Sequence, residues 1–462
     1  MAASPSSVLE NSAVLAGVLK EKRCKAEHLQ TLKTFTAALK EEKSRDAVDD
    51  ETFSSLFEFL SGLCDGLHST SVEDQDQLSV SLQLTAESFR AQRNSCIQNP
   101  RNQKLLRRLG FIGVSVKILS FLLSSKADKR GVIFEPLRCG IQFLGNVAVG
   151  NQKCKDDIWQ QSFPTLFLQL LAVADDKAVN YTTMVLHTCL DEAKVEQLCE
   201  SQNIPVALRV MELCRTHPDL DWTILIATTH FFNSPTLVKR MYCGMPHLER
   251  VSLLELILAQ LTEDPNRCGV HRNVAAFLSD SFRKDCGDVL MLATDSASSE
   301  EVLLKAQTVT LQLDILCEMT SDLGQFMFLQ NDPDLLKTTV ELLEQVHAVG
   351  KANSNVFSAA QNFSSSDEDS SFRSPVINFK AHLIRLIGNL CHGNASNQNK
   401  VRDLDGIPLI LDNCNVDSNN PFITQWAILA IRNLLEKNQQ NQEVVAALEP
   451  RGAAADCSAF RE

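Results

Sequence analysis

The stretch Ile384–Val401, "IRLIGNLCHGNASNQNKV", decides the fold, because the chain nearly repeats it at Ile428–Val445 as "ILAIRNLLEKNQQNQEVV". The two Asn-Leu pairs begin at Asn389 and Asn433, a separation of 44 residues, and the two Asn-Gln pairs that follow are separated by the same 44. A period of this length lies within the range of three-helix armadillo and HEAT repeats. The repetition therefore predicts helical units that stack on one another.

The last two copies predict the same set of three helices. Asn397 is expected to cap a short first helix, and a long third helix should carry the apolar face. A shift of 44 residues keeps every position of that face apolar. The two predicted stripes are Phe379, Leu383, Ile384, Ile387 and Leu390, and then Ile423, Ala427, Ile428, Ile431 and Leu434. Gly388, inside the earlier third helix, should cost about 1 kcal/mol relative to Ala, which predicts a close helix crossing at this position.

Weaker copies of the same pattern appear earlier in the chain. Asn94 and Asn102 repeat the spacing of 8 residues found in the later copies, and Gly110 takes the helix-breaking position. Asn146, which follows Gly145, marks another helix end of the same kind. Between about residues 175 and 350 the register fades into amphipathic segments. The low content of Gly (18) and Pro (14) also favours helices over turn-rich β structures.

We therefore predict an all-α fold, a right-handed α-solenoid of armadillo/HEAT-like repeats. The predicted organisation begins with a helical segment at 1–77, which includes a flexible start and an acidic loop. Armadillo-like repeats, degenerate in the middle, follow at 78–350. A Ser- and acid-rich loop at 351–378 separates them from the C-terminal armadillo repeats at 379–449, and 450–462 form a short tail.

Charge and cysteine usage argue against several classes of function. The chain has 44 basic and 57 acidic residues, and a net charge of −13 disfavours binding to nucleic acid. Its 15 cysteines include no C-x-x-C and its 10 histidines no H-x-x-x-H, so we predict no metal or cofactor and expect reduced, buried thiols. The start lacks a basic signal-peptide region, and no apolar run approaches a membrane span. We expect a soluble intracellular protein without membrane insertion.

The loop at 351–378, "KANSNVFSAAQNFSSSDEDSSFRSPVIN", has no periodicity and is rich in Ser, Asn and acidic residues. Ser364, Ser365 and Ser366 each precede an acidic residue by three positions, which suits an acidophilic kinase. Ser374 precedes a proline, which suits a proline-directed kinase. These four serines are the candidate phosphorylation sites, and a loop that is only solvated is the alternative.

Four residues of the repeated motif are candidates for partner binding. Arg385 and Asn389 lie one helical turn apart, and the next repeat places Gln425 and Asn433 on the matching line. Stacked repeats would assemble them into a polar stripe on one face. Alternatively, the asparagines hydrogen-bond local backbone carbonyls and contribute stability alone, as asparagine readily does. We expect stability from the asparagines and binding from Arg385.

The stretch 379–434, from "FKAHLIRLIGNL" to "AILAIRNL", closely resembles the C-terminal region of the ataxin-10 family. Further matches are "RCGIQFLGN" at Arg138, "LDILCEMT" at Leu313 and "QVHAVGKANSNVFS" at Gln345, and the resemblance covers most of the chain from about Gln83 to Leu448. It implies an armadillo-like interaction protein without catalysis. The implied processes are neuronal survival, neurite outgrowth through Ras and MAP-kinase signalling, and cytokinesis.

The same resemblance implies partners and a location. The implied partners are a heterotrimeric G-protein β subunit, O-linked N-acetylglucosamine (O-GlcNAc) transferase, a polo-like kinase and further copies of the chain in a homo-oligomer. The implied location is the perinuclear cytoplasm, with the centrosome, the basal body of the cilium and the midbody.

Two other classes of function stay open at this point. A transport or cargo adaptor of the armadillo class uses an asparagine ladder with a tryptophan four residues earlier. The positions four residues before Asn389, Asn433, Asn146 and Asn94 hold Arg385, Leu429, Gln142 and Arg90. An enzyme would need a nucleophile elbow, a phosphate loop or a metal set. "VGKANS" at Val349 has a Gly-Lys pair without the upstream glycine of a phosphate loop, so no catalytic residue is predicted.

Overall fold

The computed structural model describes residues 26–69, 75–124, 130–263, 269–294, 299–321, 324–352, 354–359 and 376–448. Within these ranges every regular element is a helix, and none is a strand, which confirms the all-α prediction. The chain divides into two compact units, Met1–His230 and Phe231–Glu462. Ser364, Ser365, Ser366, Ser374 and most of the predicted loop lie outside the described residues, as does the tail from residue 449.

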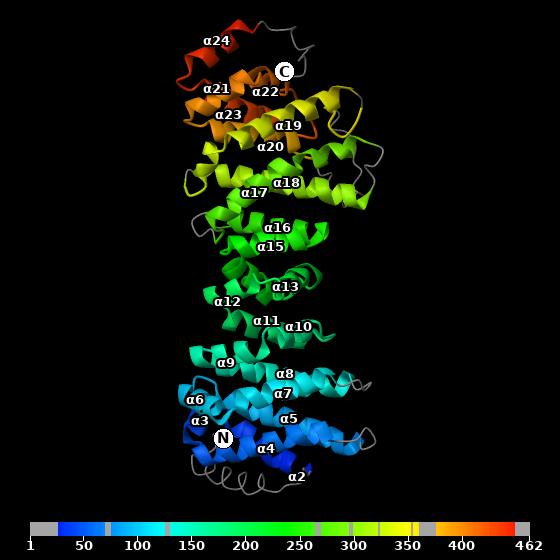
Figure 1. The fold of residues 1–462 in the computed structure, drawn as a ribbon, viewed down its shortest axis with the longest axis vertical. Coiled ribbons are helices and arrows are strands. Elements are labelled where there is room, and N and C mark those ends of the chain that lie inside the picture. The colour runs from blue at the N-terminus through cyan, green and yellow to red at the C-terminus, as the bar shows by residue number, and fades with distance from the viewer. Residues whose placement is uncertain are drawn as a thin grey trace, which may run out of the picture. The chain divides into compact units, whose positions relative to one another are not determined.

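The first unit is built from helices that recur in threes. Its helices are α2 (Ala26–Ala38), α3 (Glu42–Ala47), α4 (Asp50–Ser69), α5 (Gln75–Ser95), α6 (Pro100–Leu109), α7 (Phe111–Ser124), α8 (Arg130–Ala148), α9 (Gln152–Ser162), α10 (Thr165–Leu171), α11 (Asp176–Cys189), α12 (Glu192–Leu198), α13 (Ile204–Thr216) and α14 (Asp221–Ile226). A π-helical turn, Ala227–Phe231, follows α14. Every third helix packs on its counterpart, so that α2, α5, α8, α11 and α14 form one row and α4, α7, α10 and α13 another (Figure 1).

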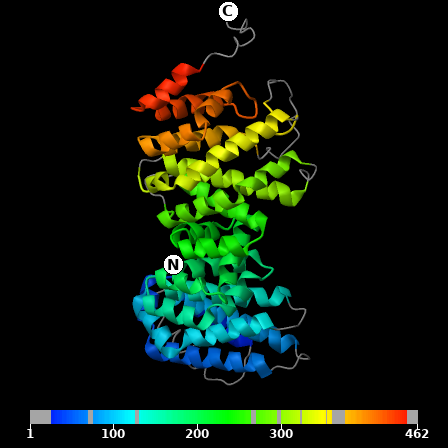
Figure 2. The same ribbon diagram turned by 45° about the horizontal axis from the view of Figure 1, so that its top comes forward.

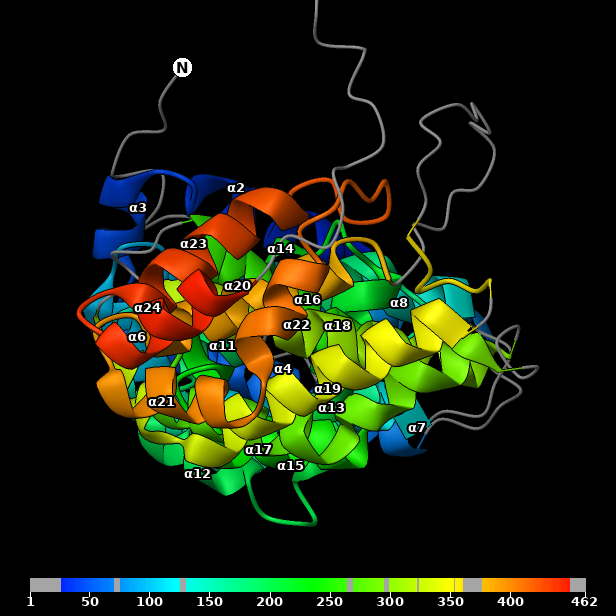
Figure 3. The same ribbon diagram turned by 90° about the horizontal axis from the view of Figure 1, so that it is seen from above.

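The second unit shows the same kind of stacking (Figure 2). Its helices are α15 (Pro235–Gly244), α16 (His247–Glu263), α17 (Arg272–Asp285), α18 (Glu300–Ser321), α19 (Pro333–Ala352), α20 (Phe379–Cys391), α21 (Ala395–Asp403), α22 (Gly406–Asp412), α23 (Ile423–Leu435) and α24 (Gln439–Ala447), with 3₁₀ turns at Cys286–Ala293 and Met327–Asn331. One row runs through α16, α18, α20 and α23, and another through α17, α19 and α22. Seen from above, α21, α22 and α23 separate as the three helices of one repeat (Figure 3). Each unit is thus a solenoid of helical repeats.

Asparagine caps set the start of the short helices α6, α21 and α24, whereas an aspartate, Asp191, caps α12. The side chains of Asn99, Asn394 and Asn438 accept a hydrogen bond from the backbone N–H three residues later. The expectation that Asn397 would be the cap is wrong, because α21 already begins at Ala395 and Asn397 lies inside it. The helix start could fall at either asparagine, and the earlier one takes the extended backbone that a cap requires.

The Asn-Gln pairs hydrogen-bond backbone carbonyls within a repeat and between neighbouring repeats. Asn397 and Asn441 each donate a hydrogen bond at 2.8 Å to the carbonyl seven residues earlier, near the end of the preceding third helix. Gln398 donates to the carbonyls of Asn433 and Glu436 in the next repeat, at 2.8 and 3.4 Å. Carbonyls in the last turn of a helix lack intrahelical partners, so these amides satisfy them. One pair therefore terminates its own repeat and joins it to the next.

The predicted apolar stripes meet the core, except at two positions of the later stripe, where Ile431 is half-buried and Ile428 is exposed. All five positions of the earlier stripe, Phe379 to Leu390, are buried. In the later stripe Ile428 is 65% exposed, because among the described residues only the short helix α24 follows α23. The predicted close crossing is confirmed, since a Cβ added at Gly388 would lie 3.0 Å from the Cα of Ala430.

Candidate binding surface on helices α20 and α23

The two asparagines of the predicted stripe are turned into the protein. Asn389 and Asn433 are 8% and 7% exposed. The amide of Asn389 donates to the carbonyl of Cys317 in α18 at 3.2 Å, and that of Asn433 donates to the carbonyl of Gly388 in α20 at 2.9 Å. Each asparagine therefore bonds the helix of the preceding repeat rather than a loop. The amide of Asn389 donates a second hydrogen bond, to the hydroxyl of Thr320 at 3.1 Å, so both asparagines are engaged inside the protein.

The same ladder continues in the first unit. The amide of Asn94 donates to the carbonyl of Thr36 in α2, and that of Asn146 donates to the carbonyl of Arg93 in α5, each at 3.1 Å. These four asparagines occupy equivalent places near the ends of the third helices α5, α8, α20 and α23. Their shared geometry supports the interpretation that the asparagines contribute to stability.

Arg385 is held between two repeats and is 12% exposed at its side chain. Its guanidinium donates to Glu318 in α18 at 2.8 Å and lies 4.7 Å from the ring centre of Trp426 in α23. Burial alone would lower the pKa of Arg385, but the hydrogen bond to Glu318 and the nearby acidic groups together outweigh it, and the net shift of the pKa is upward. The residue is a fixed cation that braces one face of the indole ring.

His382 lies one turn before Arg385 on α20 and is also paired. Its Nδ1 is 2.5 Å from a carboxylate oxygen of Asp314 in α18. The histidine and the arginine therefore both connect α20 to acidic groups on α18. Of the two pairs, Arg385 with Glu318 is an ion pair whose charges offset each other.

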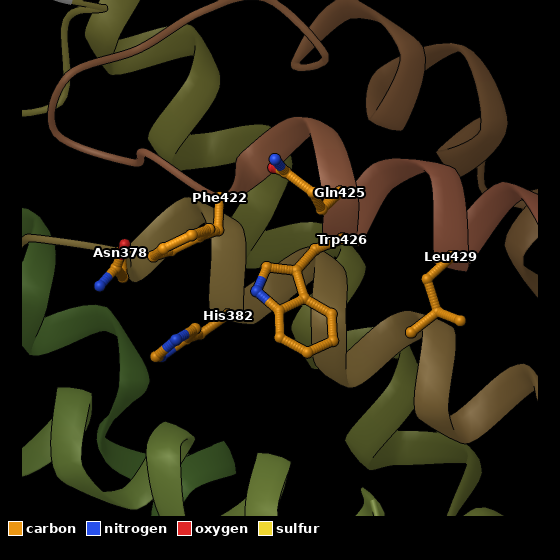
Figure 4. A pocket seen from close by; sticks show the side chains of 6 residues that line it. All are labelled: Asn378, His382, Phe422, Gln425, Trp426 and Leu429. Atoms are coloured by element: carbon orange, nitrogen blue, oxygen red, sulfur yellow. The ribbon is translucent and has the colours of Figure 1, made fainter.

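A cavity of about 500 Å³ opens beside these pairs, between α20 and α23. It is lined by Asn378, His382, Phe422, Gln425, Trp426 and Leu429 (Figure 4). The indole nitrogen of Trp426 points to the side of the cavity where Phe422, His382 and Asn378 lie, and Leu429 lies on the other side. Phe422 is 58% exposed, which is unusual for so large an apolar side chain in this protein.

The structure thus brings together part of the predicted stripe and adds residues that the sequence analysis missed. Gln425 lines the cavity and Arg385 supports it from behind, whereas Asn389 and Asn433 lie elsewhere. Phe422, Gln425, Trp426 and Leu429 are spaced i, i+3, i+4 and i+7, which places them on one helical face. That spacing is the available sequence signal, but it equally describes a buried stripe.

The described residues provide little for catalysis. Burial raises the pKa of the thiols of Cys96, Cys317 and Cys391, so they stay protonated and unreactive near neutral pH. No group of three or more His, Cys, Asp or Glu side chains in the described ranges is arranged to hold a metal ion. Among the described helices, none is both long and apolar enough to cross a bilayer.

Comparison with known proteins identifies relatives along most of the chain. Residues 379–462 match the family model described as "Spinocerebellar ataxia type 10 protein domain". The chain is 43% identical to "Ataxin-10" of Xenopus tropicalis over 376 residues, which are 80% of this chain and 76% of that protein. It is 38% identical to "Ataxin-10" of Bos taurus over 432 residues, or 92% of this chain and 89% of that protein.

A chain from the solved structure titled "A conserved phosphorylation switch controls the interaction between cadherin and beta-catenin in vitro and in vivo" aligns with a TM-score of 0.34 and 11% identity, over 91% of this chain and 99% of that one. The sequence relatives, by contrast, are close and extend along nearly the whole chain. The chain belongs to the ataxin-10 family.

Proposed function

We propose that the chain is a non-catalytic scaffold that binds partner proteins through the surface of α20 and α23. The observation that carries this proposal is the cavity beside Trp426. Phe422 lines this cavity and is exposed, whereas Arg385, next to the Trp426 ring, is held in place by its ion pair with Glu318. Large exposed aromatic side chains next to a hollow are typical of the anchoring centre of an interface. Helical-repeat proteins commonly use such extended surfaces for binding.

The biological setting follows from the family resemblance. We propose roles in neuronal survival, in neurite outgrowth through Ras and MAP-kinase signalling, and in cytokinesis. The partners proposed on the same basis are a heterotrimeric G-protein β subunit, O-GlcNAc transferase and a polo-like kinase, together with self-association. The location proposed is the perinuclear cytoplasm, the centrosome, the basal body and the midbody. Phosphorylation of Ser364, Ser365, Ser366 or Ser374 is proposed from their sequence context alone.

A cargo adaptor of the nuclear-import kind receives no support from the asparagines. In that class the ladder faces the cargo, whereas Asn389 and Asn433 donate to carbonyls of the preceding helices. The scaffold proposal depends on aromatic and amide side chains of α23 instead.

The test compares two exposed apolar residues of the same region. Phe422 lines the cavity, whereas Ile428 is similarly exposed on α23 and does not line it. Binding of the three purified candidate partners to the full chain is measured by biolayer interferometry. Phe422→Ala should weaken the binding of at least one of them about tenfold or more, the usual size of an anchor loss. Ile428→Ala should bind as the unaltered chain does. Equal binding of every partner to both variants would refute the proposal.

A further inference from the structure

A separate cavity lies in the first unit, at the turns that join α5 to α6 and α8 to α9. It has a volume of about 270 Å³ and is lined by residues 96–100, Gln103, Asn146 and the turn 149–150. The amide of Gln103 connects its two sides, because it donates to the carbonyls of Asn146 and Val149 at 3.0 and 2.9 Å. This first-unit cavity is therefore framed by hydrogen bonds of the repeat itself.

Two exposed apolar side chains border the first-unit cavity. Ile97 is 40% exposed and Val149 is 60% exposed. They occupy equivalent positions, because each follows the ladder asparagine of its own repeat by three residues. At the same position the last two repeats hold His392 and Glu436, which are polar. The repeat fold thus does not require an apolar side chain there, and contact with another molecule would remove this apolar surface from water.

The first-unit cavity lies in a strongly basic part of the sequence. Residues 90–155 contain 13 basic and two acidic residues, although the whole chain has a net charge of −13. Helices α6 and α9, which lie one above the other in Figure 1, begin beside the cavity, and neither has an acidic residue in its first turn. The positive end of each helix dipole is therefore not offset by an acidic residue of its own helix.

Three cations near the cavity have no carboxylate partner within the described residues: Arg93, Lys104 and Lys153. Arg93 donates to side-chain amide oxygens on α5 and α8. Lys104 and Lys153 are exposed on adjacent helices, because their chain neighbours Gln103 and Cys154 are in contact, with the carbonyl oxygen of Gln103 3.9 Å from the Sγ atom of Cys154. An acidic ligand would supply the missing carboxylates.

Two carboxylates lie near the same turns, and two arginines balance them. Asp46 accepts a hydrogen bond at 2.8 Å from Asn99, which lines the cavity. Asp50 is paired with Arg101 at 3.0 Å and with Arg108 at 4.0 Å, and Arg101 also donates to the backbone carbonyl of Asp46. The three unpaired cations remain in excess, so the local charge is positive.

Shape and charge together define the ligand. A cavity of about 270 Å³ is smaller than the roughly 300–1,000 Å³ typical of small-molecule sites, so it suits a single side chain. The border formed by Ile97 and Val149 favours an aliphatic or aromatic side chain. The unpaired cations favour acidic residues on either side of it. Nucleic acid would supply the negative charge but no side chain for the apolar cavity.

We propose that the first-unit cavity is a second docking surface, which binds an acidic segment of a partner protein. One aliphatic or aromatic side chain of that segment enters beside Ile97 and Val149, and flanking carboxylates pair with Arg93, Lys104 and Lys153. The inference is independent of the proposed use of α20 and α23.

The experiment uses a phage-displayed library of short random peptides. The library is selected on the full chain and counter-selected on the full chain that carries Lys104→Glu with Lys153→Glu. Enriched peptides are synthesised with a fluorescent label, and their Kd values are measured by anisotropy at roughly 50 and 300 mM NaCl, because salt screens exposed charges. They should contain at least two acidic residues beside one aliphatic or aromatic residue.

Two double variants should weaken binding for different reasons. Lys104→Glu with Lys153→Glu should raise the Kd about tenfold or more at low salt and should remove most of its salt dependence. Ile97→Ala with Val149→Ala should raise the Kd about tenfold or more at both salt concentrations, because it removes the apolar contact. All four positions are exposed, so circular dichroism melts should match those of the unaltered chain.

The matched controls are Val132→Ala and Lys177→Glu. Val132 is 49% exposed on α8, and Lys177 is exposed on α11, and neither lines the first-unit cavity. Both variants should leave the Kd unchanged. Phe422→Ala should also bind the enriched peptides normally, so this proposal and the proposed function of α20 and α23 fail or succeed separately.

Several results would overturn the proposal. One is a selection that enriches no peptide, or only peptides without acidic residues, and another is an unchanged Kd in either double variant. Tighter binding of a short single-stranded RNA would make the surface a polyphosphate site. Tighter binding of a peptide of residues 360–375 would make the chain's own segment the occupant. A lower sedimentation coefficient for Ile97→Ala with Val149→Ala would make the cavity an interface between copies of the chain.

Discussion

Asn433→Ala tests the interpretation that the asparagines hold neighbouring repeats together. The amide of Asn433 donates at 2.9 Å to the carbonyl of Gly388, which lies in the last turn of α20. Loss of this bond and of the partner of a buried carbonyl should cost about 1–3 kcal/mol. Alanine has a higher helix propensity than asparagine and returns at most about 0.7 kcal/mol. If the full 0.7 kcal/mol is returned, the expected net loss of unfolding free energy is about 0.3 to 2.3 kcal/mol.

The assay is thermal and urea denaturation of the full chain, followed by far-UV circular dichroism. For a cooperative unit of the size of Phe231–Glu462, this loss corresponds to a Tm lower by about 1 to 9 °C. Gln425→Ala is the matched control, because Gln425 lies on the same helix, is exposed and makes no hydrogen bond within the described residues. It should melt like the unaltered chain. If Asn433→Ala melted like the control but lost partner binding, the asparagine would be a binding residue and the reasoning would be wrong.

Four further substitutions test other features by the same melting measurements. Gly388→Ala should destabilise despite a gain of about 1 kcal/mol in helix propensity, because its Cβ would press on the backbone of α23, whereas Gly62→Ala has open space and should stabilise. The hydrogen bond from Arg138 lowers the pKa of Asp175. This pair should therefore stabilise the fold above pH 4 and lose its effect as the pH falls through the lowered pKa. Asp175→Asn should lower the Tm at neutral pH and should reduce the further fall in Tm at acid pH. Burial lowers the pKa of His230 from about 6.5 to about 4. The free energy of unfolding should therefore fall as the pH drops from about 6.5 to about 4, because the unfolded chain takes up the proton first. His230→Gln should reduce the slope of stability against pH in this range.

The repeat could be predicted from the sequence because its markers are chemically constrained. A side-chain amide at the position of Asn397 must reach the carbonyl of Leu390, and the amide of the next residue, Gln398, must reach across to the following repeat. Few other residue types can satisfy those carbonyls, so the Asn-Gln pair returns at a fixed spacing. The cap was misplaced because Asn394 and Asn397 have identical side chains, and only the backbone conformation distinguishes a cap from a helix interior.

The burial of α23 was harder to predict, because the helix has two apolar stripes. One stripe contains Ile423, Ala427 and Leu434, which are buried, and the other contains Phe422, Trp426 and Leu429, which line the cavity. Periodicity shows that a helix has an apolar face, but it cannot show which face another helix covers. That depends on the neighbouring repeats, and α23 is followed by only one short helix within the described residues.

The cavity itself arises from the repeat period. Asn378 and Phe422 are 44 residues apart, and so are His382 and Trp426, so the lining consists largely of equivalent positions of two successive repeats. Stacking brings such positions together whatever side chains they carry. Its character comes from the differences between the two repeats. The earlier repeat supplies an amide and a histidine that is tied to Asp314, whereas the later one supplies two large rings. Because His382 and Arg385 are both tied back to α18, they do not fill the space in front of the rings. A repeat that kept aromatic residues at both positions would close the gap by ring packing, so the hollow is a consequence of divergence between neighbouring copies.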